Sequence, residues 1–359
     1  MTHPTYTQSE FLARYDYANR TLLGQGGFGQ VFKVYDRRDH TYVALKRGDG
    51  KRRAGQQVTS LYTEVIIAQQ VPPHTNLARY EDYFIVRALD DTEYARMRYY
   101  DSGNLRHVLD RNLPIDDRDR IVQGIISGLA HLHQHSVIHR DLKPSNILIA
   151  ADPSGVLSPL IADFGLGKHL GTDGSGASNS FAGGTVRYAA PEQLLGARVG
   201  YAADVWSVGV LIYELYTGKH PYVPTSLIKS DTDITAVRVA DLARKFIPSR
   251  AKFLSDGLPS SWCDTLQGCF QTEAKLRPNI RQFPVDLGSI EFKFEPKSVS
   301  SASTKTILDR SVVHSVVSED QKIETDMERR WRIITWVVGI LTLVAVFILA
   351  IIASLESNY

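Results

Sequence analysis

Hydrophobic positions along the chain follow two patterns in succession. Up to about residue 100 they are typical of β-strands: they alternate with polar positions in VFKVYD, and VALK is a short apolar run that ends in a lysine. A helical spacing interrupts the strands at residues 59–70, and two further apolar strands follow within 77–100. Beyond them, apolar residues recur at helical intervals over 104–109 and 116–134. The chain is therefore expected to begin with a sheet and one helix and to continue mainly as helices.

A β-hairpin is predicted within the helical part. Apolar residues 147–149 and 157–161 flank a turn at 152–155. The ends of this hairpin carry Asn146 and Asp163, so both side-chain oxygens should emerge on one side of one small sheet. Magnesium prefers oxygen ligands and takes few protein carboxylates, and this pair suits it.

The longest apolar run lies near the C-terminus. Residues 333–355 carry no charge over about 23 positions, which as a helix would measure about 35 Å against a hydrocarbon core of about 30 Å. Trp331 and Trp336 stand where aromatic residues gather at a membrane interface. A transmembrane helix is expected here. The alternative, a fully buried helix of a large domain, is disfavoured by the polar segment that precedes it.

Basic residues set the expected orientation of this helix. No basic residue follows it, and four precede it closely, namely Lys322, Arg329, Arg330 and Arg332. Residues before the helix are therefore expected to be cytoplasmic, with 356–359 as a short exterior or lumenal tail. Residues 288–332 are polar and lack apolar periodicity, which predicts a flexible juxtamembrane linker with a reach of about 35 to 40 Å. The lipid bilayer is thus an expected partner.

Overall charge and cysteine content narrow the class of protein. With 41 basic and 39 acidic residues among 359, the formal net charge is +2, which argues against nucleic acid as a partner. The two cysteines, Cys263 and Cys269, lie in an apolar, helix-like stretch and are expected to be buried and reduced. Residues 1–9 show no apolar segment typical of a secretory signal, and residues 1–14 are interpreted as an N-terminal extension.

Three glycines, Gly24, Gly26 and Gly29, have the spacing of a loop that covers phosphates. A dinucleotide-binding fold would continue with a helix, whereas VFKVYD continues as a strand, so a glycine-rich hairpin over a nucleotide is the better interpretation. Lys46 follows the glycines by about 17 residues, one strand and a turn, so that both can face one ligand. Glu64, on the predicted helix, is the expected ion-pair partner of Lys46.

Charged and amide side chains crowd together in the run HRDLKPSN at residues 139–146. Asp141, Lys143 and Asn146 supply a carboxylate, an ammonium and an amide oxygen, and Asp163 adds a second carboxylate, all within about 25 residues. These are the groups needed to hold a magnesium nucleotide and to take a proton from a hydroxyl.

Two other segments bear on function. His131 and His135 lie one helical turn apart, as a zinc pair would, but no third ligand or neighbouring glutamate base accompanies them, so a metal there is not favoured. The segment between Asp163 and Glu192 is rich in glycine and hydroxyl residues, which predicts a mobile loop. It ends in GTVRYAAPE, and a helix with DVWSVG follows.

Together these motifs resemble those of eukaryotic-type serine/threonine protein kinases. The glycine loop, VALK, HRDLKPSN, DFG, GTVRYAAPE and DVWSVG occur in that family's order, and the resemblance runs from about residue 15 to residue 287. It implies an α+β, two-lobed protein-kinase fold, with an antiparallel sheet and one helix in the N-terminal lobe and a mainly helical C-terminal lobe. It also implies ATP and Mg²⁺ as cofactors and proteins with serine or threonine acceptors as substrates.

The resemblance implies a role for each matching residue. Lys46 would bind the α and β phosphates and pair with Glu64, Asp141 would orient the acceptor hydroxyl and take its proton, and Lys143 would steady the transferring group. Asn146 and Asp163 would hold magnesium. Val31, Ala44 and Leu148 would sandwich adenine, with Met97 at the back of the pocket. The full set of nucleotide-binding residues implied is Leu23, Gly24, Gly26, Gly29, Val31, Ala44, Lys46, Met97, Tyr100 and Leu148.

The resemblance also suggests acceptor class and regulation. The placement of Lys143 two residues after Asp141, and of Thr185 before Pro191, resembles that in serine/threonine kinases rather than that in the tyrosine branch. Arg140 looks like the arginine that family members use to hold a phosphate on the mobile loop. Autophosphorylation is therefore expected to order this loop. The candidate sites are Ser180 first, then Ser178, Ser175 and Thr172.

Two departures and two alternatives complete the interpretation. Arg98 stands where an acidic residue is common, and EAKLRP at 273–278 replaces a usual Asp-Pro version, although Arg277 is still expected to pair with Glu192. A membrane-tethered, catalytically inactive scaffold is the alternative function, and it is disfavoured because the full set of catalytic groups is present. A dinucleotide oxidoreductase is disfavoured by the strand after the glycines.

Overall fold

A computed structural model describes the chain from residue 4 to residue 285, with gaps. The described ranges are 4–26, 29–48, 61–87, 91–109, 111, 113–164, 186–197, 199–224 and 235–285. Within them, no helix combines the length and apolar character needed to cross a bilayer. The linker and transmembrane helix expected at 288–355 lie outside the described ranges. Residues 165–185 also lie outside them, which is most of the segment between Asp163 and Glu192 that is expected to be a mobile loop.

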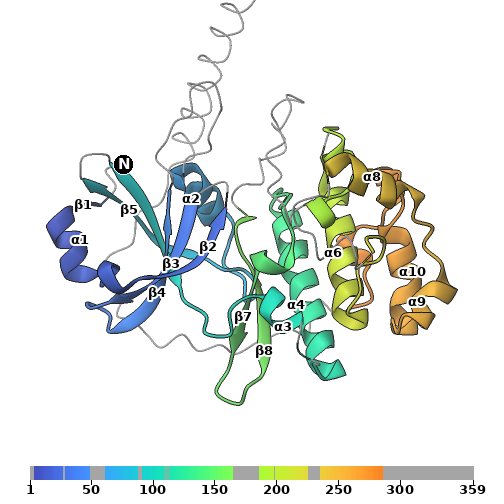
Figure 1. The fold of residues 1–359 in the computed structure, drawn as a ribbon, viewed down its shortest axis with the longest axis horizontal. Helices are drawn as coiled ribbons and strands as arrows, with labels where there is room; N and C mark the ends of the chain where they lie inside the picture. Colours follow the sequence, from blue (N-terminus) through green and yellow to red (C-terminus); the bar gives the residue numbers. More distant parts are fainter. Residues whose placement is uncertain are drawn as a thin grey trace, which may run out of the picture. The chain divides into compact units, whose positions relative to one another are not determined.

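The N-terminal lobe, residues 4–98, is built on a six-stranded sheet with the order β1-β5-β6-β4-β3-β2 (Figure 1). Every neighbouring pair is antiparallel except β1 and β5, which are parallel. The strands are β1 (Thr5–Thr7), β2 (Thr21–Gly26), β3 (Gly29–Asp36), β4 (Thr41–Arg47), β5 (Tyr80–Arg87) and β6 (Thr92–Arg98). The helices are α1 (Gln8–Arg14), the short 3-10 helix η1 (Tyr17–Asn19) and α2 (Leu61–Gln70).

Alternation along the strands gives this sheet two apolar faces. On β4, Val43 and Leu45 belong to an outer cluster, whereas Ala44 belongs to the main core on the opposite face. Successive side chains of a strand point to opposite faces, so Lys46 shares the face of Ala44. Because successive side chains of β4 point to opposite faces, Lys46 lies on the side of the sheet where α2 packs.

The N-terminal lobe differs from the expected antiparallel sheet with one helix. The segment expected to be only an extension contributes β1 and α1, and Phe11 of α1 enters the outer cluster with Tyr15, Phe84 and Tyr94. The face of the sheet that carries the outer cluster is rich in aromatic side chains, and exposing them to water would cost free energy. Helix α1 covers part of this face. The expectation of one helix and a wholly antiparallel sheet was wrong for this reason.

The C-terminal lobe is mainly helical, as the spacing of apolar residues predicted. Helices α4, α6 and α8 to α10 lie to the right of the sheet in Figure 1. Its helices are α3 (Leu105–Leu109), α4 (Ile115–Gln134), α5 (Pro191–Leu194), α6 (Tyr201–Thr217), α8 (Ala236–Lys245), α9 (Arg250–Ser255) and α10 (Ser260–Cys269). The described residues of this lobe also form three 3-10 turns, η2 (Pro144–Asn146), η5 (Ala274–Leu276) and η6 (Ile280–Gln282), and one hairpin, β7 (Ile147–Ala151) with β8 (Leu157–Ile161). Both cysteines are free and buried, as expected.

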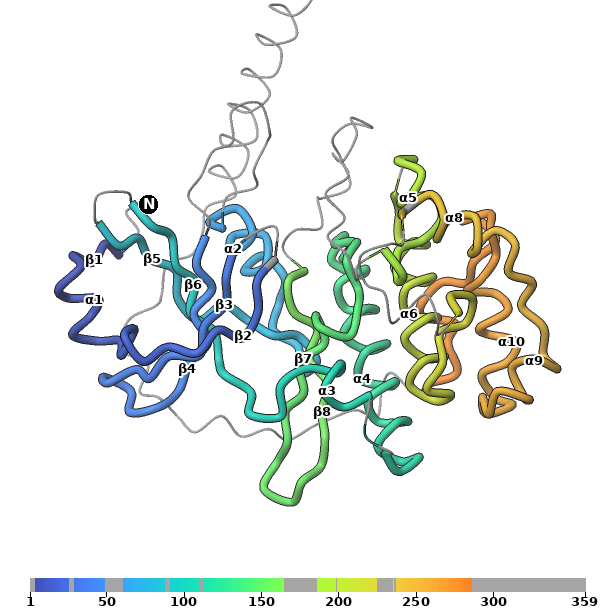
Figure 2. The backbone as a smooth tube through the Cα atoms, viewed as in Figure 1, coloured from blue at the N-terminus to red at the C-terminus, as the bar shows by residue number. Residues whose placement is uncertain are grey.

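The hairpin β7–β8 lies between the sheet and the helices (Figure 2). Ile161 of β8 forms a bridge with Leu77, just before β5, and Leu148 of β7 forms one with Asn104. On its other side β8 packs closely on α4, since a Cβ added to Gly124 would lie 2.5 Å from the Pro159 ring. The hairpin is thus held by both lobes, and its two ends have fixed positions.

Candidate functional site

The centre of the candidate site is a buried ammonium held by two carboxylates. Lys46 Nζ of β4 donates to both oxygens of Glu64 on α2, at 2.7 and 2.9 Å, and to Asp163 Oδ1 at 3.1 Å. Lys46 is 4% exposed and Glu64 1% exposed, while a third of the Asp163 side chain is accessible. The predicted pair of Lys46 and Glu64 is confirmed, and Asp163 joins it from the end of β8.

Burial and charge oppose each other in this cluster. Burial alone would lower the pKa of Lys46, but the charges of Asp163 and Glu64 outweigh it and raise the pKa, so the amine stays an ammonium ion. Burial also acts to raise the pKa of Asp163, and the Lys46 charge overcomes it and lowers the pKa. For Glu64 burial prevails, and the pKa is raised despite the neighbouring ammonium. Hydrogen-bond donors to Glu64 are therefore needed to keep it ionised.

Tyr80 is one such donor, and sequence reasoning missed it. Its hydroxyl donates to Glu64 Oε1 and lies 3.4 Å from Lys46 Nζ and 3.5 Å from Asp163 Oδ1. Burial, followed by the charges of Glu64 and Asp163, raises the pKa of Tyr80, so the phenol keeps its proton. A tyrosine at the start of an apolar strand gives no sequence signal of such a contact.

A second group of polar side chains surrounds Asp141. Lys143 Nζ donates to Asp141 Oδ2 at 2.8 Å, and the amide nitrogen of Asn146 donates to the same oxygen at 3.1 Å and to the Asp141 carbonyl at 2.8 Å. The other carboxylate oxygen, Oδ1, is buried and accepts no hydrogen bond within the described part of the chain. This oxygen therefore keeps its capacity to accept a hydrogen bond.

The loop that carries Asp141 is fixed from below by Asp204 on α6. The carboxylate of Asp204 accepts hydrogen bonds from the backbone N–H groups of His139 and Arg140 and contacts the His133 ring, each at 2.8 Å. Burial would raise the pKa of Asp204, but its bonds and charge interaction with His133 lower it, so it remains a carboxylate. The motif DVWSVG lies on a helix, as predicted, but its sequence gives no signal of this contact.

The ring of His139 joins the two halves of the site. Its Nδ1 accepts from the backbone N–H of Asp141, and its Nε2 lies 2.9 Å from the carbonyl of Ala162, next to Asp163. Arg140 and Asp163 themselves adopt φ angles of 66° and 59°, in the left-handed region that residues other than glycine seldom occupy. Such local strain is found where surrounding contacts impose a geometry, here the Asp204 and His139 contacts.

The donor set for a metal fits magnesium. Asn146 and Asp163 stand at the two ends of the hairpin, where Ile147 pairs with Ile161 and Ala162 donates to the Asn146 carbonyl at 2.8 Å. Because the Asn146 amide nitrogen is bonded to Asp141, its side-chain oxygen is left to act as a ligand. One amide oxygen and one carboxylate, with phosphate oxygens and water to complete the shell, suit a hard divalent cation.

The glycine hairpin closes two strands of the N-terminal sheet, and the apolar residues expected around adenine belong to or pack against one cluster. Gly26 pairs with Gly29 to close β2 and β3, and a Cβ on Gly29, whose φ is 131°, would lie 2.0 Å from the Arg47 carbonyl. Only glycine fits there. The expected adenine neighbours belong to the main core or pack against it, namely Val31, Ala44, Met97, Tyr100 and Leu148. Leu23 is exposed on β2, and Gly24 has open space beside it.

Regulatory residues are described only in part. Arg140 is half-buried, and its Nε finds no partner among the described residues. Burial lowers its pKa although the Asp204 charge opposes this, so a further negative charge would be favourable beside it. The expected phosphorylation sites Ser180 and Ser178, together with Thr185, Ser175 and Thr172, lie outside the described ranges.

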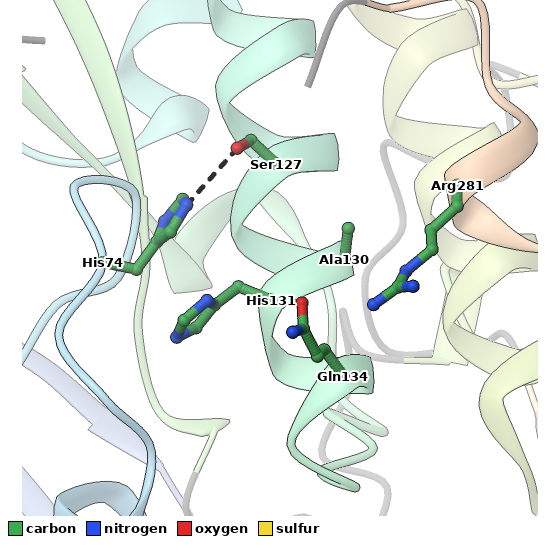
Figure 3. Close-up of a pocket in the computed structure, with 6 residues that line it drawn as sticks. All are labelled: His74, Ser127, Ala130, His131, Gln134 and Arg281. Atoms are coloured by element: carbon green, nitrogen blue, oxygen red, sulfur yellow. Dashed lines mark hydrogen bonds between the residues drawn. The ribbon is translucent and has the colours of Figure 1, made fainter. Parts of the chain in front are cut away.

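A separate pocket of about 370 Å³ lies beside α4 (Figure 3). Its lining residues are His74, Ser127, Ala130, His131, Gln134 and Arg281, and none of them belongs to the site around Lys46. The His131 and His135 rings are 4.4 Å apart, but His131 Nε2 and His135 Nδ1 each lie within hydrogen-bond distance of a backbone carbonyl. Within the described ranges no group of three or more His, Cys, Asp or Glu side chains is arranged to hold a metal ion.

Comparison with known proteins places the chain in a family. Residues 17–284 match the model of the protein kinase domain, which is more than half of the chain, and the chain therefore belongs to the protein kinase family. Protein kinases as a family use ATP, typically with Mg²⁺, and act on protein substrates. The two-lobed arrangement of sheet and helices agrees with this assignment.

Its relatives include proteins named as serine/threonine kinases. The chain is 37% identical over 213 residues to "Cysteine-rich receptor-like protein kinase 6" of Oryza sativa subsp. japonica, covering 57% of this chain and 29% of that protein. It is 29% identical over 226 residues to "Serine/threonine-protein kinase ULK1" of Homo sapiens (61% and 21%) and 32% over 213 residues to "Serine/threonine-protein kinase PLK4" of Drosophila willistoni (58% and 26%). The chain thus spans between a fifth and a third of the length of these relatives.

Proposed function

We propose that the protein is an active serine/threonine kinase that transfers the γ-phosphate of ATP to protein hydroxyls. The observation that carries the proposal is the joint placement of Lys46, Glu64 and Asp163 in one hydrogen-bonded cluster and of Asp141, Lys143 and Asn146 in another. Asn146 and Asp163 are brought together by the hairpin that links these clusters. A scaffold without catalysis would not require the two clusters to keep this geometry.

The chemistry follows from the positions of these side chains. Bound Mg²⁺ would neutralise phosphate charge, and Asn146 and Asp163 are the residues that would hold it. Lys46 would bind phosphate oxygens with its ammonium, which Glu64 keeps in place. Asp141 would accept the hydroxyl proton, since its Oδ1 has no hydrogen-bond partner within the described part of the chain, and Lys143 would stabilise the charge on the transferred group. Catalysis would rest on positioning and charge rather than on a covalent intermediate.

Hydroxyl class is supported by Lys143 and by the relatives. Lys143 contacts the Asp141 carboxylate, so an ammonium stands beside the proposed base where a phosphoryl group would pass. Both ULK1 and PLK4, to which this chain is similar, carry serine/threonine kinase in their names. Thr185, before Pro191, is proposed to add to this preference.

Regulation by loop phosphorylation is proposed from Arg140. Its half-buried guanidinium, with an Nε that has no partner in the described part of the chain, would be stabilised by a phosphate on the segment that follows Asp163. Ser180 is the first candidate acceptor, followed by Ser178. Mass spectrometry of active protein should find phosphate on this segment, and activity retained with every serine and threonine of 172–185 unmodified would refute this mode of regulation.

Location at a membrane is proposed from the sequence of residues 333–355. The uncharged run has the length of a bilayer-spanning helix, and its basic flank would place the kinase domain on the cytoplasmic side. Tethering would raise the effective concentration of membrane-associated substrates. Imaging the full chain and a version ending before Trp331 tests this, because only the full chain should be found on membranes.

The deciding test of the function is transfer of labelled γ-phosphate from ATP and Mg²⁺ by the purified full chain. Asp141→Asn should abolish most of the transfer, because an amide cannot take a proton from the acceptor. Asp241→Asn, an exposed change on α8, serves as the control and should leave the rate unchanged. Equal labelling by wild type and Asp141→Asn would remove Asp141 from this role, and no labelling by wild type, with nucleotide binding intact, would favour the inactive scaffold.

A further inference from the structure

Tyr80 completes the hydrogen bonding of the buried cluster around Lys46. It is 8% exposed, and its hydroxyl donates to Glu64 Oε1. The same hydroxyl lies within 3.5 Å of both Lys46 Nζ and Asp163 Oδ1. It therefore contacts each of the three charged groups, although it carries no charge itself.

A β-bulge directs Tyr80 to this place. Tyr80 pairs with Met97, but the next paired residue of β5 is Asp82, opposite Arg96, so Glu81 is an extra residue in the strand. In a regular strand, residues three apart face opposite sides of the sheet. Tyr80 and Tyr83 nevertheless both lie in the main core, because the bulge between them reverses the alternation. Bulges commonly re-aim a side chain next to a functional site.

The ammonium of Lys46 has no donor to spare in this arrangement. It has three N–H groups and four acceptors around it: the two Glu64 oxygens, Asp163 Oδ1 and, at 3.4 Å, the Tyr80 hydroxyl oxygen. To bind a phosphate, Lys46 must release one of these partners. Release of Asp163 is the productive choice, because Asp163 is then free to bind metal and the Lys46–Glu64 pair stays intact.

We propose that Tyr80 is a positioning residue that fixes Glu64 during this exchange. By donating to Oε1, the Tyr80 hydroxyl holds the Glu64 carboxylate in its orientation, so Lys46 keeps both bonds to Glu64 and turns the third donor from Asp163 to a phosphate. A buried carboxylate needs such further donors to offset its lost hydration. The inference rests on the proposed function, because the phosphate that Lys46 binds is taken to be that of the nucleotide substrate.

The test compares Tyr80→Phe with Tyr83→Phe in the full chain. Tyr83 is buried on the same strand and donates to Glu93 at 3.0 Å, so it is a matched loss of one phenol hydroxyl. Two quantities are measured: the KM for MgATP in the transfer assay, and the Kd for MgATP by titration of the protein without acceptor. Tyr80→Phe should raise both by about tenfold, the scale of a lost hydrogen bond to a charged group. Its KM for the protein substrate should be unchanged, and Tyr83→Phe should alter neither nucleotide constant.

A third variant separates the hydroxyl from the ring. Tyr80→Leu also lacks the hydroxyl, so it should weaken nucleotide binding at least as much as Tyr80→Phe. If ring packing were the contribution, the Phe variant would behave like wild type and only the Leu variant would be impaired, which would overturn the proposal. Thermal unfolding of each variant is recorded alongside, and a Tyr80→Phe protein that does not fold would assign Tyr80 a purely structural role.

Failure of this inference is distinguishable from failure of the proposed function. Wild type that transfers phosphate, with an unchanged Tyr80→Phe variant, refutes the role of Tyr80 alone. Wild type that binds MgATP but transfers nothing refutes the proposed activity, and the comparison of Kd values still decides the role of Tyr80. Wild type that does not bind MgATP overturns both.

Discussion

Arg277 and Glu192 form a bidentate ion pair that joins the segment after η5 to helix α5. Nη1 and Nη2 of Arg277 donate to the two Glu192 oxygens at 2.7 and 2.8 Å. Arg277 also donates to the carbonyls of Gln271 and Ala202, and its guanidinium lies 5.0 Å from the centre of the Trp206 ring. A fully buried guanidinium is thus satisfied on every side, as a buried charge requires.

Replacing Arg277 is therefore expected to destabilise the domain strongly. Arg277→Ala leaves the Glu192 carboxylate and several carbonyls without donors, and the free energy of unfolding should fall by about 3 to 5 kcal/mol. Urea unfolding of the full chain, followed by circular dichroism, measures this. Arg250→Ala is the control: its pair with Asp264 is exposed, so its loss should cost less than about 1 kcal/mol. Similar losses for both variants would contradict the assignment of a stabilising role to the buried pair.

The outer aromatic cluster of the N-terminal lobe gives a second prediction. Phe11 is 3% exposed between Tyr15, Tyr17 and Tyr94, with ring centroids 4.9 to 5.3 Å away. Phe11→Ala should lower the free energy of unfolding by about 3 to 5 kcal/mol. The next residue, Leu12, is 43% exposed, so Leu12→Ala should cost about 0.5 kcal/mol or less. Thermal unfolding of both variants measures the difference, and equal melting temperatures would contradict the prediction.

Asp204 gives a prediction on rate. Asp204→Asn replaces one of the two acceptor oxygens with an amide group that cannot accept from the backbone of His139 or Arg140. The Asp141 loop should shift, and a shift of about 1 Å in a catalytic group can reduce the rate about a hundredfold. The measurement is kcat for phosphate transfer by folded protein, with the exposed change Asp264→Asn as the control. A variant with normal kcat and a lower melting temperature would limit Asp204 to a structural role.

Much of the candidate site was predictable because its groups lie on elements with clear local patterns. Lys46 ends an alternating strand, and Asn146 and Asp163 flank a hairpin, so their placement follows from the period of the strands. The pairing of Lys46 with Glu64 and of Arg277 with Glu192 could be predicted from motifs at fixed spacing. Each of these features is local in sequence or belongs to a known order of motifs.

Other features depend on contacts between distant segments with no local signal. The strand β1 has three residues, and its parallel pairing with β5 joins positions about 80 apart in the chain. Tyr80 reaches Glu64 only because of a bulge, and bulges change the facing of a residue without changing the apolar pattern nearby. Asp204 supports the Asp141 loop across more than 60 residues. Such contacts are set by packing of the whole domain, which the linear pattern does not contain.

His220 predicts how stability depends on pH. It is buried, its Nδ1 accepts from the Val223 backbone N–H at 3.1 Å, and its Nε2 lies 3.1 Å from the Arg187 carbonyl. These bonds require a neutral ring. Burial lowers the pKa of His220 from 6.5 to about 3, so the folded protein resists a proton that the unfolded chain accepts below about pH 6.5. The contribution of His220 to stability is therefore present above pH 6.5 and is lost as the pH falls toward 3.

The expected loss from this one group is about 2 kcal/mol between pH 7 and pH 5. His220→Asn cannot be protonated, so this variant should be less stable than wild type at pH 7, and the difference should narrow by about 2 kcal/mol at pH 5. Urea unfolding of both proteins at the two pH values measures the change, and because other titrating groups are common to both, their contributions cancel in the difference. A constant difference from pH 7 to pH 5 would mean that His220 takes up its proton in the folded protein as readily as in the unfolded chain, contrary to its burial between two hydrogen-bonded backbone segments.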